Sequence, residues 1–296
     1  MLPVPLAREI DAIAADNVTG AMALVRRAAE AVRRSAAALG SPDAVAVTAD
    51  SLEAAQPAMA PMFHLAERLR RAAQSDRLPA SIARCCHELL EQIESSDAAI
   101  ARHALALFPN DAIVLTHSYS ATVAAVLEGA HSAGKLRRVI ATESRPVCEG
   151  VQLARRLAES GIAVDLVVDA AMTHVITEAQ LVLAGADTLS AHGLVNKIGT
   201  RLAALAAREQ GLPFYVACSS LKIAPAGFVP TVERPRPASE IVPGEIPGCR
   251  VRNYYFDTTP LELLTGVVTE NGRTTDYPGA GRQASNRIAG LKSRAD

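Results

Sequence analysis

The chain has 296 residues, a formal net charge of −1 and 49% hydrophobic residues, which is enough length to bury a large core and form two domains. The near-zero charge provides no field that would hold nucleic acid by counterion release, and no apolar run of about 18 residues predicts a membrane span. The first residues lack the pattern of a secretory signal, and the 5 cysteines have neither metal-ligand spacing nor a disulfide pattern. We therefore expect a cytoplasmic protein without metal or cofactor that binds neither nucleic acid nor membrane.

Residues 6 to about 105 are predicted to be helical because apolar residues recur at helical spacing. Pro57 and Pro61 suggest that a helix begins between them, and a further helix is expected over 97–107. The basic stretch 68–71 is interpreted as a solvated helix face, since no aromatic residues are interleaved with it. We expect residues 1–107 to form a helical domain. Two apolar stripes carry the pattern: Leu24, Ala28, Ala31 and Val32, then Ile82, Cys85, Cys86, Leu89, Leu90 and Ile93.

After Asn110 the pattern changes to short apolar runs that alternate with helical stretches about every 25 residues. This alternation is typical of an α/β fold with a parallel, doubly wound sheet. We therefore expect residues 108–296 to form a Rossmann-like ligand-binding domain. The expected strands cover 112–116, 138–142, 163–168, 181–184 and 214–217, and the expected helices cover 121–131, 149–160, 171–180 and 200–210.

The stretch from Pro225 to Pro260 contains 7 of the 17 prolines and predicts a long surface excursion. It returns to an apolar Tyr254–Phe256 run and a short helix over 260–264. The tail after Thr275 is expected to be loose.

The segment from Gly185 to Thr200 is the most informative part of the chain. It places Asp187, Asn196 and Lys197 after an apolar strand, and we interpret it as a strand, a loop and a helix beginning at Lys197. Ligands collect at the carboxyl edge of such sheets, and a helix N-terminus there offers free N–H groups to an anion. The alternatives are that Asp187 caps a turn, Asn196 caps the helix and Lys197 is solvated. Lys222, after the 214–217 strand, is either a second cation at this edge or a solvated lysine.

These motifs resemble a known superfamily, which contains the regulatory subunits of translation initiation factor 2B, methylthioribose-1-phosphate isomerase and ribose-1,5-bisphosphate isomerase. The resemblance covers residues 10 to 272. It implies an N-terminal helical domain followed by a Rossmann-like domain, and a homodimer or higher homo-oligomer. The matching segments are Leu115–Ser120, Thr142–Pro146 with Glu149 and Gly150, Gly161 and Ile162, Val168 and Asp169, Gly185–Thr200, Pro213–Val216 with Lys222, Phe256–Pro260, and Thr269 with Glu270.

The resemblance implies an acid/base role for Asp187, which matches an aspartate that the isomerases use beside a cysteine. Partial burial would raise the pKa of Asp187 and let it donate a proton near neutral pH. Ser118 stands where the isomerases have the cysteine, and its hydroxyl would need a strong base beside it. Thr19 and Gln56 stand where the isomerases have arginines that clamp phosphate. The initiation-factor subunits also lack the thiol.

Further residues could bind the ligand or serve the fold. His117 could act as a base or pack as a structural residue, and Cys148 could replace the thiol or simply pack. Glu143 and Arg145 could orient Asp187 or the ligand, or form a structural ion pair, whereas Asp257 is expected to serve the closing of the site or a dimer contact. The candidate ligand-binding set is Gly20, Ala21, His117, Tyr119, Ser120, Glu143, Arg145, Asn196, Lys197 and Lys222, with Asp187 and Ser118 as the candidate catalytic residues.

Two functions follow from this interpretation. The first is an aldose–ketose isomerase-like enzyme that acts on a sugar 1-phosphate. The second is a non-catalytic regulatory or assembly subunit that senses a sugar phosphate or nucleotide. In both, the partner is a phosphorylated small molecule, and the missing thiol leaves enzymatic activity open.

Overall fold

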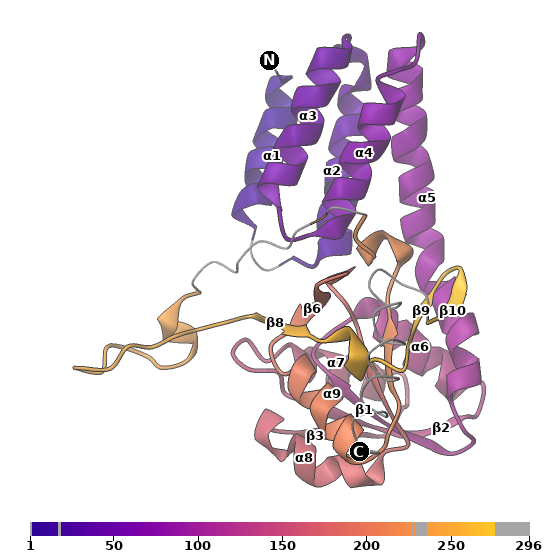
Figure 1. Ribbon diagram of the computed structural model, residues 1–296, viewed down its shortest axis with the longest axis vertical. Coiled ribbons are helices and arrows are strands. Elements are labelled where there is room, and N and C mark those ends of the chain that lie inside the picture. Colours follow the sequence, from indigo (N-terminus) through magenta and orange to yellow (C-terminus); the bar gives the residue numbers. More distant parts are fainter. Residues whose placement is uncertain (1, 17–18, 226–227, 229–235, 276–296) are drawn as a thin grey trace, which may run out of the picture. The chain divides into compact units, whose positions relative to one another are not determined.

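The computed structural model describes residues 2–16, 19–225, 228 and 236–275 (Figure 1). Its contacts divide the chain into unit 1, residues 1–96 with 221–231, and unit 2, residues 97–220 with 232–296. The sequence-based division at residue 107 stays a prediction. The helix predicted over 97–107 is the last part of a longer helix, α5 (Leu78–Ala104), which is followed by a 3₁₀ turn over Leu105–Leu107.

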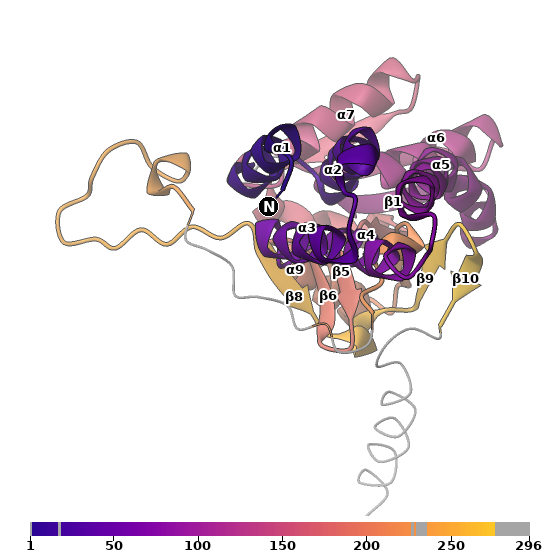
Figure 2. The ribbon, with the colours of Figure 1, turned by 90° about the horizontal axis from the view of Figure 1, so that it is seen from above.

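Helices make up unit 1. Ser41 begins α3 by accepting a hydrogen bond from the Ala44 N–H, and Pro61 lies in the first turn of α4, as the proline spacing predicted. The two predicted apolar stripes lie in one core, with Cys85 only partly buried beside it. Viewed end-on in Figure 2, α1 and α2 lie side by side, as do α3 and α4. The helices that begin in this unit are α1 (Val4–Ala15), α2 (Ala21–Ser35), α3 (Pro42–Ala55), α4 (Ala60–Ala72) and α5.

Unit 2 is built on a seven-stranded sheet with the order β10-β9-β7-β4-β1-β2-β3, in which only β10 runs antiparallel to its neighbour. This confirms the predicted doubly wound α/β fold. β1 and β4 are buried along their whole length, as expected for continuous apolar runs in a parallel sheet. The strands are β1 (Ala112–His117), β2 (Leu136–Thr142), β3 (Val164–Val167), β4 (Leu181–Ala184), β7 (Phe214–Ala217), β9 (Gly266–Thr269) and β10 (Gly272–Thr274).

The sheet is flanked by α6 (Ala121–Ser132) and α7 (Glu149–Glu159), which pack together, and by α8 (Met172–Val175) and α9 (Thr200–Glu209), which also pack together. The predicted helix over 171–180 is wrong in extent. Only α8 is α-helical there, between 3₁₀ turns over Asp169–Ala171 and Ile176–Glu178. The residues 260–264 likewise form a 3₁₀ turn, Leu261–Leu263, instead of an α-helix.

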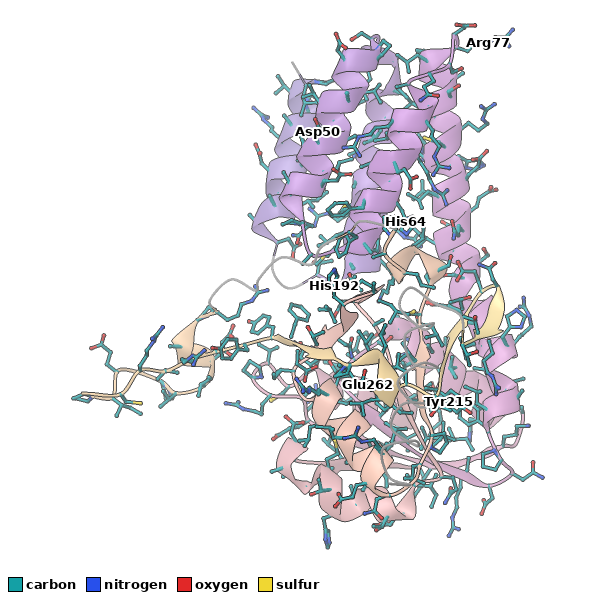
Figure 3. The ribbon with its side chains drawn as sticks, in the orientation of Figure 1. Asp50, His64, Arg77, His192, Tyr215 and Glu262 are labelled. Atoms are coloured by element: carbon teal, nitrogen blue, oxygen red, sulfur yellow. The ribbon has the colours of Figure 1, made fainter. Side chains whose placement is uncertain are left out.

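A second, three-stranded sheet corrects the predicted loop between β4 and α9. It contains β5 (Thr188–Ser190), β6 (Gly193–Lys197) and β8 (Phe256–Thr259) in the antiparallel order β5-β6-β8. Gly193 has φ 135°, and a Cβ there would lie 2.8 Å from the Thr259 carbonyl oxygen, so β6 approaches β8 through a glycine. His192, labelled in Figure 3, lies in the turn between β5 and β6.

The described part of the proline-rich excursion, residues 236–255, is largely exposed and includes a 3₁₀ turn over Ala238–Glu240. Residues 226–227, 229–235 and the tail from 276 lie outside the described residues. Within the described ranges, no helix is both long enough and apolar enough to cross a membrane.

Candidate functional site

The strand order of the large sheet reverses between β1 and β4, because β2 and β3 follow on one side of β1 and β4 pairs on the other. In open α/β sheets this switch point forms a crevice at the carboxyl ends of the two strands. Ser118–Ser120 follow β1 and Gly185–Asp187 follow β4. A Cβ on Gly185 would lie 2.9 Å from both Cβ and Oγ of Ser120, so the two connections pack directly against each other. This contact brings the Ser118 and Asp187 segments together.

Buried His117 joins a third segment to this edge. One ring nitrogen, Nε2, lies 2.7 Å from the Ile198 carbonyl oxygen, which can only accept, so Nε2 carries the proton. Nδ1 then accepts a hydrogen bond from the Thr142 hydroxyl at 2.5 Å. A Cβ on Gly199 would lie 2.7 Å from Nε2, so this connection also needs a glycine. His117 therefore anchors the end of β6 onto the end of β1.

The environment of His117 favours the structural role over the role of a base. Burial lowers its pKa, an effect that the nearby charge of Lys197 adds to and those of Asp169 and Glu149 oppose. A neutral imidazole with both nitrogens hydrogen-bonded to the protein has no free position for a substrate proton. Its contacts make His117 a residue that positions the site.

The β5–β6 hairpin positions Asp187 and Asn196. The Asp187 N–H donates to the carbonyl oxygen of Val195, the residue that pairs with Thr188, so Asp187 is held at the start of the hairpin. Asp187 is half-buried. The Asn196 amide donates to Thr200 Oγ1 at 2.9 Å, so it contacts the first residue of α9.

Lys197, the next residue along β6, alternates to the other face of the strand, where it forms a buried ion pair with Glu149. Its side chain is 9% exposed, against 25% for Glu149. The Lys197 ammonium also lies 4.6 Å from the centre of the Tyr255 ring. The alternative of a solvated Lys197 is therefore wrong: its charge is balanced by Glu149 at the first turn of α7. The sequence motif contained Glu149, but no role was assigned to it.

The N-terminus of α9 differs from the prediction. The helix begins at Thr200 and not at Lys197, and the Asp257 carboxylate accepts hydrogen bonds from the N–H groups of Gly199, at 2.9 Å, and Arg201. A side chain of the protein thus occupies the anion position that we expected a ligand to use. Burial raises the pKa of Asp257, and the two backbone hydrogen bonds oppose this rise.

The connection after β2 is shaped by Asp169, whose carboxylate accepts from the N–H groups of Ser144 and Arg145. The Arg145 guanidinium donates to the carbonyl oxygens of Glu240 and Ile241. Arg145 therefore contacts the proline-rich excursion, where an ion pair with Glu143 was one of the expected alternatives. Glu143 itself is half-buried just after β2.

Four further candidate residues lie on the connections after β1 and β2. Ser120 caps α6 by accepting from the Val123 N–H, while Tyr119 is exposed and its hydroxyl accepts from Arg156. Ser118 is buried, with φ 69° in the left-handed region. Cys148 precedes α7, also with positive φ, and its thiol lies near the Pro146 carbonyl oxygen.

The remaining candidates belong to unit 1, and their ligand-binding roles stay predictions. A Cβ at Gly20 would meet nothing within 4 Å, so close packing does not require this glycine; Ala21 is buried at the start of α2. Lys222 is buried and not solvated.

Gln56 and Thr19, which stand where the isomerases have arginines, form hydrogen bonds at the C-terminal end of α1. Gln56 donates to the carbonyl oxygens of Ile13 and Asp16, and the Thr19 N–H donates to the Asp16 carboxylate. Within the described residues, no three His, Cys, Asp or Glu side chains gather as metal ligands.

A doubly wound, mainly parallel sheet whose strand order reverses between β1 and β4 defines a Rossmann-like domain. The sequence model of the Initiation factor 2 subunit family matches residues 10–276. The chain belongs to this family, which confirms the resemblance stated above.

Relatives named as initiation-factor subunits and relatives named as sugar-phosphate isomerases are both similar to this chain. A putative translation initiation factor eIF-2B subunit 2-like protein of Pyrococcus horikoshii is 32% identical, over 92% of this chain and 97% of its own length. A ribose 1,5-bisphosphate isomerase of Archaeoglobus fulgidus is 39% identical over 65% of this chain and 63% of its own length. A methylthioribose-1-phosphate isomerase of Syntrophotalea carbinolica is 33% identical over 75% of this chain and 72% of its own length.

Solved structures agree with the fold. The Pyrococcus horikoshii translation initiation factor eIF-2B superposes with a TM-score of 0.78 at 30% identity, covering 92% of this chain and 97% of that one. The 5-methylthioribose 1-phosphate isomerase of the same organism gives a TM-score of 0.71 at 22% identity, covering 96% and 87%, and supports the fold alone.

Proposed function

We propose that this protein is a cytoplasmic phosphosugar-binding enzyme that interconverts an aldose 1-phosphate and a ketose 1-phosphate in the crevice at the ends of β1 and β4. The observation that supports the proposal is a pair of close contacts, Gly185 against Ser120 and Gly199 against His117, which join the segments after β4 and β6 to the end of β1. Asp187, Lys197 and Ser118 belong to these three segments. Relatives named as sugar-phosphate isomerases support the substrate class.

The reaction needs no external oxidant. Conversion of a cyclic aldose 1-phosphate to the ketose opens the ring, moves a hydrogen from C2 to C1, and transfers the O2 proton to the former ring oxygen. Half-buried Asp187 would exchange protons with the sugar oxygens. The Ser118 hydroxyl would hydrogen-bond the sugar from the position at which the isomerases carry a thiol.

The phosphate would be held by Lys197, whose ammonium would move from Glu149 toward the ligand. Asn196, in β6, and Arg145, on the connection after β2, would orient ligand hydroxyls. We further propose that the protein forms a homodimer or a higher homo-oligomer; a solved structure of the same fold is described as a tetrameric complex of beta and delta subunits, which supports assembly but not its homomeric form.

The test is turnover of ribose 1,5-bisphosphate and methylthioribose 1-phosphate, followed by NMR of the products. Asp187→Asn should reduce kcat by about 10²- to 10⁴-fold, the usual contribution of a positioned acid/base group. Ser118→Cys should raise kcat, because a thiol ionises closer to neutral pH than a hydroxyl.

The alternative function, a non-catalytic subunit that senses the ligand, makes a different prediction. In that case a sugar phosphate or nucleotide raises the melting temperature of the native chain, but neither the native chain nor Ser118→Cys turns it over. If neither binding nor turnover occurs with any sugar phosphate, the proposal is wrong.

A further inference from the structure

Unit 1 contains a cavity of about 500 Å³ between α4 and the first turns of α5. The residues that line it come from the end of α4, from the connection over 73–77 and from α5. Arg77, labelled at the end of the bundle in Figure 3, marks this connection. The lining residues are Arg68, Arg71, Ala72, Ser75, Ser81, Arg84, Cys85 and Glu88.

The basic stretch 68–71, interpreted from the sequence as a solvated face, divides between two sides of α4. Arg70 pairs with Glu53 at 2.6 Å and with Asp50 at 2.7 Å, which are both on α3. Arg68 and Arg71 line the cavity instead. The Arg68 guanidinium donates to the neutral Gln92 amide oxygen at 2.6 Å, which orients it without neutralising its charge.

The carboxylates beside the other two arginines hold them weakly. Arg71 lies 3.5 Å from Glu67 and Arg84 lies 3.9 Å from Glu88, and all four side chains are more than half exposed. Exposed pairs within one helix contribute little, so an anion that contacts several guanidinium groups at once can displace them.

Neutral donors complete the lining. The hydroxyl of buried Ser81 donates to Ser75 Oγ at 2.8 Å. Ser81 lies in the first turns of α5, a helix of 27 residues, where the helix dipole also favours negative charge.

We propose that this cavity is a second ligand site, which binds a small phosphorylated metabolite through Arg68, Arg71 and Arg84. Guanidinium groups match phosphate oxygens in fork geometry, and the volume falls in the range of small-ligand pockets. The lining contains no aromatic side chain on which a nucleobase could stack, which favours a non-aromatic ligand such as a polyphosphorylated sugar or polyol. Because the site lies wholly within unit 1, it does not depend on the function proposed for unit 2.

Cys85 makes the site measurable. It lies on the cavity wall, whereas its neighbour Cys86 is buried in the core. The side-chain hydrogen bond with Cys86 and the charge of Arg68 lower the pKa of the Cys85 thiol. Cys249, exposed on the unit 2 excursion, provides an internal reference for alkylation.

The experiment measures the alkylation rate of each cysteine by iodoacetamide in the full chain, by mass spectrometry, during titration with pyrophosphate. Sodium chloride at matched ionic strength is the control. We expect Cys85 alkylation to slow saturably, about tenfold at ten times the dissociation constant, while Cys249 is unaffected. Arg68→Gln, Arg71→Gln and Arg84→Gln should each raise that constant about tenfold or more, whereas Arg34→Gln, at an exposed position outside the cavity, should not.

Because Arg68→Gln also changes the intrinsic reactivity of Cys85, each variant is judged by the ratio of rates with and without pyrophosphate. Arg71 and Arg84 are exposed, so their substitution tests the site even if Arg68→Gln does not fold. The proposal is overturned if pyrophosphate on the order of 1 mM gives no protection. It is equally overturned if all three arginine variants retain full protection, or if sodium chloride protects Cys85 as well.

Discussion

The buried pair between Lys197 and Glu149 gives the sharpest prediction for the stability of unit 2. Lys197 is 9% exposed, and Glu149 Oε2 is buried without a hydrogen-bond partner among the described residues. Removing one partner of a buried pair costs about 3–5 kcal/mol, because the other charge stays behind uncompensated. The one-quarter exposure of Glu149 and the ring of Tyr255 beside the ammonium reduce this cost, so we expect about 2–4 kcal/mol for Glu149→Leu.

Lys197→Met leaves the carboxylate without its cation and should cost about as much. The double variant Glu149→Leu/Lys197→Met removes both charges, keeps similar volume, and should cost about 1 kcal/mol or less. The coupling energy between the two sites is then about 3 kcal/mol or more. Urea denaturation followed by far-ultraviolet circular dichroism measures all four proteins. Additive costs, with the double variant as unstable as the sum of the single ones, would refute the reasoning.

Three further predictions concern the framework of the crevice. Burial lowers the pKa of His117 below its ordinary 6.5, so on acidification the unfolded chain binds this proton before the folded chain does. The contribution of His117 to stability should therefore be constant above about pH 6.5 and fall below it. Urea midpoints should show a shallower fall for His117→Gln. Asp257→Ala removes the acceptor for the N–H groups of Gly199, which precedes α9, and Arg201 in its first turn, and should cost about 1–2 kcal/mol. An unchanged urea midpoint would contradict the capping role. Gly185→Ala places a Cβ 2.9 Å from Ser120 and should lower the free energy of unfolding by about 1–3 kcal/mol. Gly40→Ala is the control, because a Cβ there meets nothing within 4 Å. Equal changes in the melting temperatures of the two variants would argue against the close contact.

The central strands β1 and β4 could be predicted from the sequence because they are apolar on both faces, whereas β9 and β10 were not among the expected strands. Ala112–Thr116 and Leu181–Ala184 are continuous apolar runs between helical stretches, and such runs indicate parallel strands covered on both sides. The β5–β6 hairpin could not be predicted in the same way. Thr188 and Ser190 are polar yet buried, and β6 is held by β8, which lies beyond the long excursion.

For the site residues, positions along the chain could be predicted, but contacts between distant segments could not. Asp187 follows a recognisable strand, so its position at the carboxyl edge could be predicted. The partners of Lys197 and of the α9 N-terminus could not, because Glu149 and Asp257 reach them from distant segments. Asp257 accepts from Gly199, 58 residues earlier in the chain. Spacing within a motif carries no information on contacts of this kind.

The excursion between the two sheets is closed at its base. Asn253 donates to the Pro237 carbonyl oxygen, the Tyr255 hydroxyl donates to Glu240, and the Arg236 guanidinium lies 4.3 Å from the centre of the Tyr255 ring. These contacts at the base separate the rest of the excursion from the strands that the excursion connects. Since loop-closure entropy grows only with the logarithm of length, evolution can lengthen, shorten or rewrite residues 242–252 at small energetic cost. Relatives can thus diversify at this tip while Phe256 and Asp257 return to β6 in the same register.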